Sequence, residues 1–141
     1  MDLPPCMDEY ASAYGVPPIV VEIIAEKEGG EPGIVVGNDN GTVDVGVMQI
    51  NSVWFEPGNP VDLPGRGITL ERVRDNACLN IAIGTWIIAQ YHDRMDGHWG
   101  KTFAAYNAGP GNWQGGTPRT LPAASVLTMP ADQTFVALDH E

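Results

Sequence analysis

Residues 38–51 read NDNGTVDVGVMQIN and carry the strongest structural signal in the chain. An Asn/Gly turn at 38–41 separates two runs rich in β-branched residues, 33–36 before it and 42–45 after it. β-Branched runs on either side of an Asn/Gly turn are typical of a β-hairpin. The sequence therefore predicts one small hairpin.

Helices are expected on both sides of this hairpin. The helix over 19–28 follows Pro17 and Pro18, which suit a first helical turn, and it ends at Gly29. Residues 79–95 are apolar on most faces, which predicts a central, buried helix. Shorter helices are expected over 6–14, 70–76 and 103–107, a loop over 56–67, and a last helical turn or two within 121–127. The predicted fold class is α+β, mainly α, with a small hairpin beside a helical core.

Length and charge narrow the possible functions. The 141 residues contain no internal repeat and no domain boundary, so we expect one domain over 1–141. Seven Lys and Arg against 18 Asp and Glu give a net charge of −11, which argues against a nucleic-acid partner and a polybasic membrane surface. No apolar run approaches the roughly 18 residues of a membrane span, so stable membrane insertion is not expected.

The two cysteines and the N-terminus leave the compartment open. Cys6 and Cys78 are too far apart for a CxxC pair, and two thiols exclude a four-thiolate zinc site. They are either buried thiols or a disulfide, and a disulfide indicates a location outside the cytosol. Residues 1–5 have neither the basic nor the apolar region of a signal peptide. The chain is therefore either cytosolic or a mature form with its signal peptide removed.

Known cofactor and metal motifs are missing from the sequence. It has no Gly-rich phosphate loop, no HExxH and no serine nucleophile elbow, and its three histidines lack metal-ligand spacing. We therefore expect no metal or cofactor. The remaining candidates for chemistry are carboxylates.

Glu28 is the first candidate. At about 100° per residue from Ile19, Glu28 falls at roughly 180°, inside an apolar arc that spans roughly 0° to 200°. Burial and the negative end of the helix dipole both disfavour the carboxylate anion and raise its pKa. A raised pKa suits a general acid. The alternative is a frayed helix end with Glu28 in water.

Asp44 is the second candidate. In the predicted strand it faces away from Val43 and Val45, and it could face Glu28 across a groove. Two carboxyl groups across a sugar-sized groove are the machinery of glycoside cleavage. The alternative is an Asp that bonds the backbone of its own turn.

Four motifs together resemble a known family. Glu28, the segment 38–51, CLNI at 78–81 and AYNAG at 105–109 occur in the order and spacing of the lysozyme-like lytic transglycosylases. Cys6 and the YGVPP run at 14–18 are similar to the small periplasmic members that accompany type III secretion, type IV secretion and conjugation machines. The resemblance covers about residues 6–113, and the tail at 115–141 matches no motif of this family.

The resemblance implies a reaction and the residues that perform it. Members cleave the MurNAc–GlcNAc β-1,4 bond of peptidoglycan and form 1,6-anhydroMurNAc, which opens the cell wall locally for a secretion or conjugation machine. It also implies a periplasmic or secreted location and a Cys6–Cys78 disulfide. The implied roles are Glu28 as general acid and base, Gln49 on the groove floor, Asn51 on the acetamide of an N-acetyl sugar, Tyr106 against Glu28, and Asn107 on the local backbone.

Several alternatives remain open at this level. In c-type lysozymes, which residues 38–54 also resemble, an Asp at the place of Asp44 is the second catalytic carboxylate, and the reaction is then hydrolysis. Trp54 and Phe55 either stack on sugar rings or belong to the core. Gly29 stands where many members have Ser, so a substrate-binding hydroxyl is missing.

The charge of −11 opposes binding to anionic peptidoglycan. It predicts a weak enzyme that a partner recruits, or a non-catalytic peptidoglycan-binding assembly module.

Overall fold

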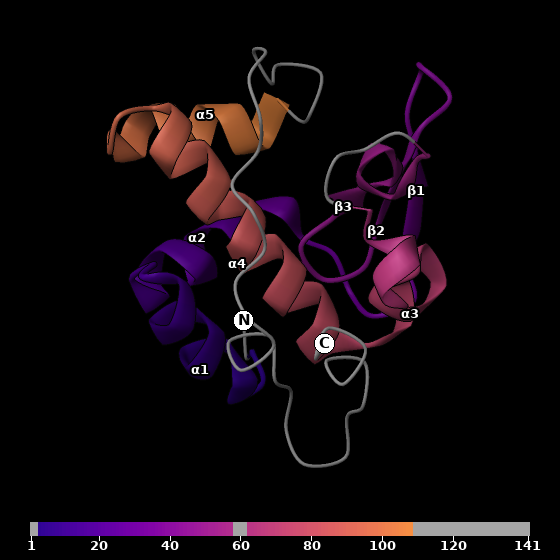
Figure 1. The fold of residues 1–141 in the computed structure, drawn as a ribbon, viewed down its shortest axis with the longest axis horizontal. Helices are drawn as coiled ribbons and strands as arrows, with labels where there is room; N and C mark the ends of the chain where they lie inside the picture. Colours follow the sequence, from indigo (N-terminus) through magenta and orange to yellow (C-terminus); the bar gives the residue numbers. More distant parts are fainter. Residues whose placement is uncertain (1–2, 58–61, 109–141) are drawn as a thin grey trace.

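The computed structural model describes residues 3–57 and 62–108, and the structural statements below refer to these residues. Helix α4 (Ala77–Arg94) crosses the molecule and separates a helical part from a part that contains the sheet (Figure 1). Helices α1 (Cys6–Tyr14), α2 (Pro18–Glu28) and α5 (Trp99–Ala108) form the helical part, and α3 (Leu70–Asp75) lies beside the sheet. The predicted mainly helical α+β class is confirmed. The tail at 115–141 and the helical turn expected within 121–127 lie outside the described residues.

Glycine and proline set the limits of α1 and α2, as predicted. Gly15 and Gly29 follow the two helices with φ of 71° and 67°, a left-handed conformation that glycine adopts without strain. Pro18 occupies the first turn of α2, where its missing N–H leaves no helical hydrogen bond unmade. Both helices therefore begin and end close to the residues that the sequence indicated.

The apolar side chains of α2 divide between core and surface, which corrects the expectation of one apolar face. Ile19 and Ile23 are 58% and 48% exposed, so they do not belong to the core. The buried side chains are Val20, Val21, Ile24 and Ala25. On a helical wheel they occupy roughly 100° to 240°, and Glu28, at roughly 180°, lies in the middle of this arc.

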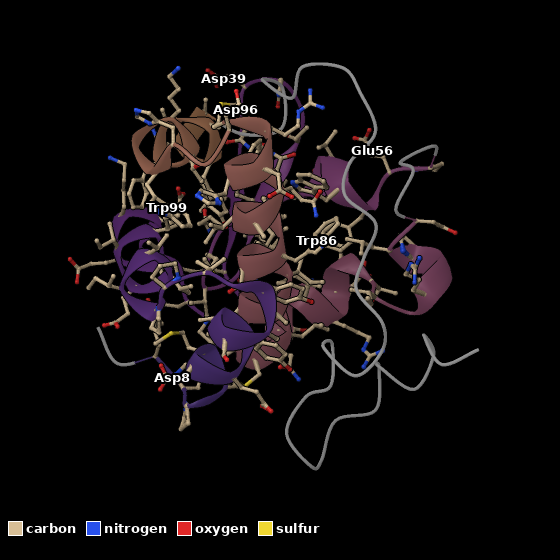
Figure 2. The ribbon with its side chains drawn as sticks, turned by 60° about the vertical axis from the view of Figure 1, so that its left-hand side comes forward. Asp8, Asp39, Glu56, Trp86, Asp96 and Trp99 are labelled. Carbon is tan, nitrogen blue, oxygen red and sulfur yellow. A yellow bond between two sulfur atoms is a disulfide. The ribbon has the colours of Figure 1, made fainter. Side chains whose placement is uncertain are left out.

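Helix α4 forms the centre of the core, as its sequence predicted. Its residues from Leu79 to Tyr91 are all buried. The side chain of Asn76 caps the helix by accepting a 2.9 Å hydrogen bond from the Leu79 N–H. Figure 2 shows Trp86 and Trp99 on opposite sides of α4, toward the sheet and toward the helical part. The helix therefore contributes packing surface to both parts of the molecule.

Helix α5 begins four residues before the predicted start at 103. The ring of His98 caps it by accepting a 3.0 Å hydrogen bond from the Lys101 N–H. Trp99 stacks on His92 of α4 with 3.7 Å between ring centroids. Histidine is not among the preferred N-cap residues, so the sequence carried no start signal at this point.

The sheet has three antiparallel strands in the order β1-β2-β3. The predicted hairpin is present as β1 (Val35–Gly37) and β2 (Val43–Val45), with Val35 opposite Val45. Strand β3 (Ile50–Asn51) was not predicted, because two residues are too short to show alternation. A tight turn, in which Gly46 and Gln49 have φ of 73° and 53°, connects β2 to β3.

Close backbone approaches hold this turn in place. A Cβ atom at Gly30, just after α2, would collide with the carbonyl oxygens of Gly46 and Val47. A Cβ atom at Gly84 of α4 would collide with the side chain of Met48. The segment that follows α2 and the middle of α4 therefore both pack closely against the turn at residues 46–49.

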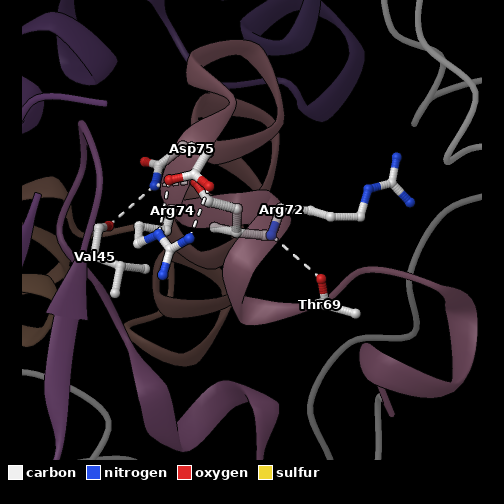
Figure 3. Close-up of polar contacts among 7 residues, drawn as sticks. Val45, Thr69, Arg72, Arg74 and Asp75 are labelled. Carbon is white, nitrogen blue, oxygen red and sulfur yellow. Dashed lines mark hydrogen bonds and ion pairs between the residues drawn. The ribbon is translucent and has the colours of Figure 1, made fainter. Parts of the chain in front are cut away.

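Helix α3 joins the sheet to α4. Its N-cap residue Thr69 accepts a 3.2 Å hydrogen bond from the Arg72 N–H, and Arg74 pairs with Asp75 at the surface (Figure 3). The described part of the predicted loop at 56–67 contains a short 3₁₀ helix, η2 (Pro64–Arg66).

The disulfide implied by the resemblance is confirmed. Cys6 of α1 and Cys78 of α4 are bonded, with 5.9 Å between their Cα atoms and 72 positions between them in sequence. Closing a loop of this length stabilises a fold by about 4 kcal/mol in the chain-entropy account. In the described residues, no helix combines the length and hydropathy needed to cross a membrane.

Candidate active site

A cavity of about 450 Å³ lies between the end of α2, the sheet and α5. This volume is within the usual range of small-molecule sites. The cavity brings together residues that are far apart in sequence, including both predicted catalytic residues and five predicted substrate-binding residues. These lining residues are Glu28, Asp44, Gln49, Asn51, Trp54, Tyr106 and Asn107. Phe55, the other aromatic considered for sugar stacking, does not line the cavity and packs against the core.

Glu28 is the last residue of α2, and its side chain is half-buried. The pKa of its carboxyl is raised from 4.5 to about 7, first by desolvation on burial and then by the negative charge of Asp44. The positive charge of Lys27 opposes this rise. At neutral pH, Glu28 therefore populates both the acid form, which donates a proton, and the carboxylate form, which accepts one.

Asp44 lies on β2 and shares the cavity with Glu28. Its Oδ1 accepts a 2.9 Å hydrogen bond from the side-chain Nδ2 of Asn51. The turn at 38–41 is held by other groups, since Asn40 Oδ1 accepts from the Thr42 N–H at 3.0 Å. Within the described residues, the Asp44 carboxylate therefore bonds a neighbouring side chain and not the backbone of its turn.

Asn51 is almost fully engaged by the protein itself. Besides Asp44, its Nδ2 donates to Thr42 Oγ1 at 3.1 Å, and its Oδ1 accepts from the Val53 N–H at 2.9 Å. The second bond caps the 3₁₀ helix η1 (Ser52–Phe55). One lone pair of Oδ1 remains for a ligand.

Gln49 and Trp54 form the inner wall of the cavity. Gln49 Nε2 donates to the Gly46 carbonyl at 3.1 Å, which holds the side chain over its own turn. Trp54 is only 4% exposed and packs edge-on against Trp86 with 5.6 Å between ring centroids. Most of the Trp54 ring therefore belongs to the core, and only a small part of it can reach a ligand.

Tyr106 and Asn107 approach the cavity from α5. Tyr106 is buried, and its hydroxyl donates a 2.9 Å hydrogen bond to the Met48 carbonyl in the turn between β2 and β3. Burial raises the pKa of this phenol well above its usual value, and the charge of Glu28 adds to the rise. Tyr106 therefore lies near Glu28 while its hydroxyl hydrogen is committed to Met48. Asn107 is exposed at the rim.

Asn80 is a site-forming residue that the sequence analysis did not assign. It is fully buried on α4, its Oδ1 accepts from the Met48 N–H at 2.8 Å, and its Nδ2 donates to the carbonyls of Val45 and Val73, each at 3.0 Å. Figure 3 draws the bond that reaches Val45. The signal for this role was a polar amide inside an otherwise apolar stretch of the helix, because a buried amide requires partners.

A second cavity, of about 300 Å³, was also not predicted. It lies between α2 and α5 and shares Glu28, Tyr106 and Asn107 with the first cavity. In the described residues, no group of three or more His, Cys, Asp or Glu side chains is placed to hold a metal ion.

Comparison with known proteins adds independent information. The sequence model of the Transglycosylase SLT domain matches residues 5–119. "Protein IpgF" of Shigella sonnei is 30% identical over 105 residues, which are 74% of this chain and 65% of that protein. "Peptidoglycan-binding-like protein" of Escherichia coli O157:H7 is 31% identical over 112 residues, 74% of this chain and 64% of that protein.

A third relative, "Invasion protein IagB" of Salmonella typhimurium, is 26% identical over 105 residues, 74% of this chain and 62% of that protein. The matched region thus spans less than two thirds of the length of each of these relatives.

Proposed function

This chain belongs to the transglycosylase SLT family, and from that premise we propose that it is a lytic transglycosylase of peptidoglycan. The bond cleaved is the β-1,4 linkage between MurNAc and GlcNAc. The observation that carries the proposal is Glu28, a half-buried carboxyl with a pKa of about 7 in a cavity of sugar-binding size.

Glu28 performs both proton transfers of the reaction. In its acid form it protonates the glycosidic oxygen, so that the GlcNAc leaves as an alcohol. The resulting carboxylate then takes the proton of the MurNAc 6-hydroxyl as this oxygen bonds C1 and closes the 1,6-anhydro ring. No water is consumed, and Glu28 ends the cycle protonated. A pKa near ambient pH serves both steps, because neither form is rare.

Asp44 stabilises the positive charge that develops on the MurNAc ring. An oxocarbenium-like transition state is lowered in energy by a fixed negative charge beside it. The hydrogen bond from Asn51 orients the Asp44 carboxylate toward this task.

A second candidate reaction is lysozyme-type hydrolysis. It is favoured by the same observation that Asp44 shares the cavity with Glu28 and bonds no turn backbone. In that reaction Asp44 attacks C1 and forms a covalent intermediate, which water then releases with Glu28 acting as base.

The remaining residues hold the sugar and the cavity wall. The free lone pair of Asn51 Oδ1 accepts the N–H of the MurNAc or GlcNAc acetamide, and Gln49 forms the floor under the ring. The edge of Trp54 contacts the sugar face, and Asn107 contacts the strand at the rim. Gly29 offers no hydroxyl, so the strand has one hydrogen bond fewer than in many members of the family.

The proposed site of action is the cell wall. A disulfide is stable in the periplasm and outside the cell, where peptidoglycan is also found. The name of the relative "Invasion protein IagB" supports a role connected with invasion, and the motifs at 6 and 14–18 are similar to members that accompany secretion and conjugation machines. We infer that the protein opens peptidoglycan locally, beside components of a secretion or conjugation apparatus.

The test is a digest of purified peptidoglycan with the wild type and with Glu28→Gln, read by mass spectrometry. The expected products are one water lighter than ordinary reducing-end muropeptides, and Glu28→Gln releases none. Reducing-end products would instead establish hydrolysis. Release of neither product by the wild type, together with retention on sacculi, would replace the proposal with a non-catalytic binding module.

A further inference from the structure

The second cavity adjoins the first one at Glu28, Tyr106 and Asn107, which line both. Its wall includes the apolar side chains Ile23 and Phe103, and Lys27 lies at its edge. A ligand long enough to pass Glu28 could therefore reach from the first cavity into the second. The further inference concerns this second cavity and rests on the function proposed above.

The position of Asp44 indicates which cavity binds the reacting MurNAc and which lies on the side of the leaving GlcNAc. Asp44 lines the first cavity and not the second. In glycosidases the carboxylate other than the acid lies beside the anomeric carbon that reacts. The first cavity therefore holds the MurNAc that forms the anhydro ring, and the second lies on the side of the leaving GlcNAc. In peptidoglycan, the next sugar on that side is a MurNAc that carries a stem peptide.

The apolar side chains beside the second cavity are unusually exposed. Ile23 is 48% exposed and Ile19, one turn earlier, is 58% exposed, although a helix normally turns such side chains toward the core. Phe103 of α5 is half-buried and faces the same cavity. An apolar wall next to the candidate active site suits a ligand with aliphatic groups.

Lys27 adds a positive charge to this wall. It is exposed, it forms no ion pair within the described residues, and its charge lowers the pKa of Glu28. This effect disfavours the acid form of Glu28, so a role in proton transfer does not account for a lysine at position 27. Lys27 and Lys101 are the two lysines of a chain with a net charge of −11. A cation at this point complements an anionic substrate group.

We propose that the cavity between Lys27 and Phe103 binds the stem peptide of the MurNAc on the leaving side. The Lys27 ammonium pairs with a carboxylate of the stem peptide, and Ile23 and Phe103 contact its alanine methyl groups. The protein then distinguishes peptide-bearing glycan strands from strands whose peptides have been removed.

The test compares two substrates that differ only in the peptide. Peptidoglycan strands are used as prepared or after an amidase has removed their stem peptides, and kcat/KM is measured on each. The wild type is expected to prefer peptide-bearing strands about tenfold, as one charge-assisted contact allows. Lys27→Gln is expected to abolish this preference by slowing cleavage of peptide-bearing strands relative to peptide-free strands.

Lys101→Gln is the matched control. It makes the same charge change on α5, outside both cavities, and the substrate preference should be unaffected. Lys27→Gln also removes a charge that lowers the pKa of Glu28, but this affects both substrates equally and cancels in their ratio. An equal change on the two substrates would therefore overturn the proposal and leave Lys27 with an electrostatic effect on Glu28 alone.

A binding measurement separates this proposal from the catalytic one. Glu28→Gln, which should not cleave, is titrated with a GlcNAc–MurNAc disaccharide that carries or lacks the stem peptide. Tighter binding of the peptide form, lost on adding Lys27→Gln, supports the subsite even if no reaction is found. Equal binding of the two forms overturns it. NMR chemical shifts of Phe103 provide a second check. If they change with protein concentration and not with added ligand, a second copy of the protein covers the cavity, and the proposal is also overturned.

Discussion

The side-chain amide of Asn51 donates a 2.9 Å hydrogen bond to the carboxylate of Asp44 across the β2–β3 pairing, in which the two residues are register partners. The same Asn51 side chain caps η1 through the Val53 N–H. The orientation of Asp44 therefore depends on a strand of two residues and on the helix that follows it.

We predict that Asn51→Ala lowers kcat by about tenfold and stability by about 1–2 kcal/mol, because Asp44 loses its orienting donor and η1 loses its cap. Steady-state kinetics and urea unfolding measure the two effects. If Asn51 acts through Asp44, its loss should matter little in an Asp44→Asn background. A rise in KM alone would assign Asn51 to substrate binding only.

Asn76→Ala is the control for stability. It removes the cap of α4, which should cost about 1 kcal/mol, but Asn76 does not line the first cavity. Its kcat at a temperature where it is fully folded should equal that of the wild type. A lower kcat would mean that modest destabilisation alone explains the Asn51 result.

The pKa of Glu28 predicts the shape of the pH–rate profile. Since the acid form must protonate the leaving group, kcat/KM should fall as pH rises through about 7. Asp44→Asn removes a negative charge that raises this pKa, so the midpoint should move to lower pH. Asp8→Asn, an exposed change on α1, should not move it. A midpoint unaffected by Asp44→Asn would contradict the electrostatic coupling of the two carboxylates.

The same pKa predicts a pH-dependent difference in stability. The folded pKa of Glu28 is raised from 4.5 to about 7, so its contribution is fully present below about 4.5 and is lost as pH rises through about 7. Glu28→Gln is neutral at every pH. Its Tm should therefore match the wild type at pH 4 and exceed it at pH 8. A wild type that is as stable as the variant at pH 8 would indicate a solvated Glu28.

Asn80 should be a large determinant of stability. Asn80→Leu leaves the Met48 N–H and the carbonyls of Val45 and Val73 buried without this partner, which should cost about 3–5 kcal/mol. Urea unfolding measures the loss. Asn38→Ala removes one exposed hydrogen bond and should change stability by less than about 0.5 kcal/mol. Similar losses in the two variants would show that the turn does not depend on Asn80.

The acidic surface predicts an unusual salt dependence of binding to sacculi. Asp8, Asp39, Glu56 and Asp96 are exposed around the molecule (Figure 2), and the chain carries a net charge of −11. Repulsion from anionic peptidoglycan should weaken as the Debye length falls from about 30 Å at 0.01 M salt to about 8 Å at 0.15 M. Pull-down with purified sacculi should therefore retain more protein at the higher salt. Stronger retention at low salt would contradict this expectation.

Local signals predicted most of the fold. Helices α1 and α2 were found because glycine and proline mark their ends, and the hairpin because an Asn/Gly turn separates two β-branched runs. The position of Glu28 on the buried side of α2 followed from helical periodicity. The apolar residues of α2 cover a wide arc of the helical wheel, and the sequence alone does not show which half of this arc faces the core. The exposure of Ile19 and Ile23 was therefore not predicted.

Long-range contacts explain the rest of what was missed. Strand β3 exists because its two residues pair with β2, and no local pattern marks it. The bond between Asn51 and Asp44 depends on that pairing. Asn80 lies 32 positions after Met48 in sequence, and only the folded chain brings the two together. The second cavity likewise requires α2 and α5 to lie side by side.

The Cys6–Cys78 disulfide closes a covalent ring that contains Glu28, Asp44 and the whole sheet, whereas α5 lies outside it. Partial opening that detaches α5 from the rest would expose the second cavity and remove Tyr106, while Glu28 and Asp44 stay within the covalent ring. The walls of the first cavity that carry Glu28 and Asp44 therefore lie within the covalent ring, whereas the α5 wall shared by both cavities does not. A fluctuation of α5 would therefore change the second cavity without opening the covalent ring that contains Glu28 and Asp44.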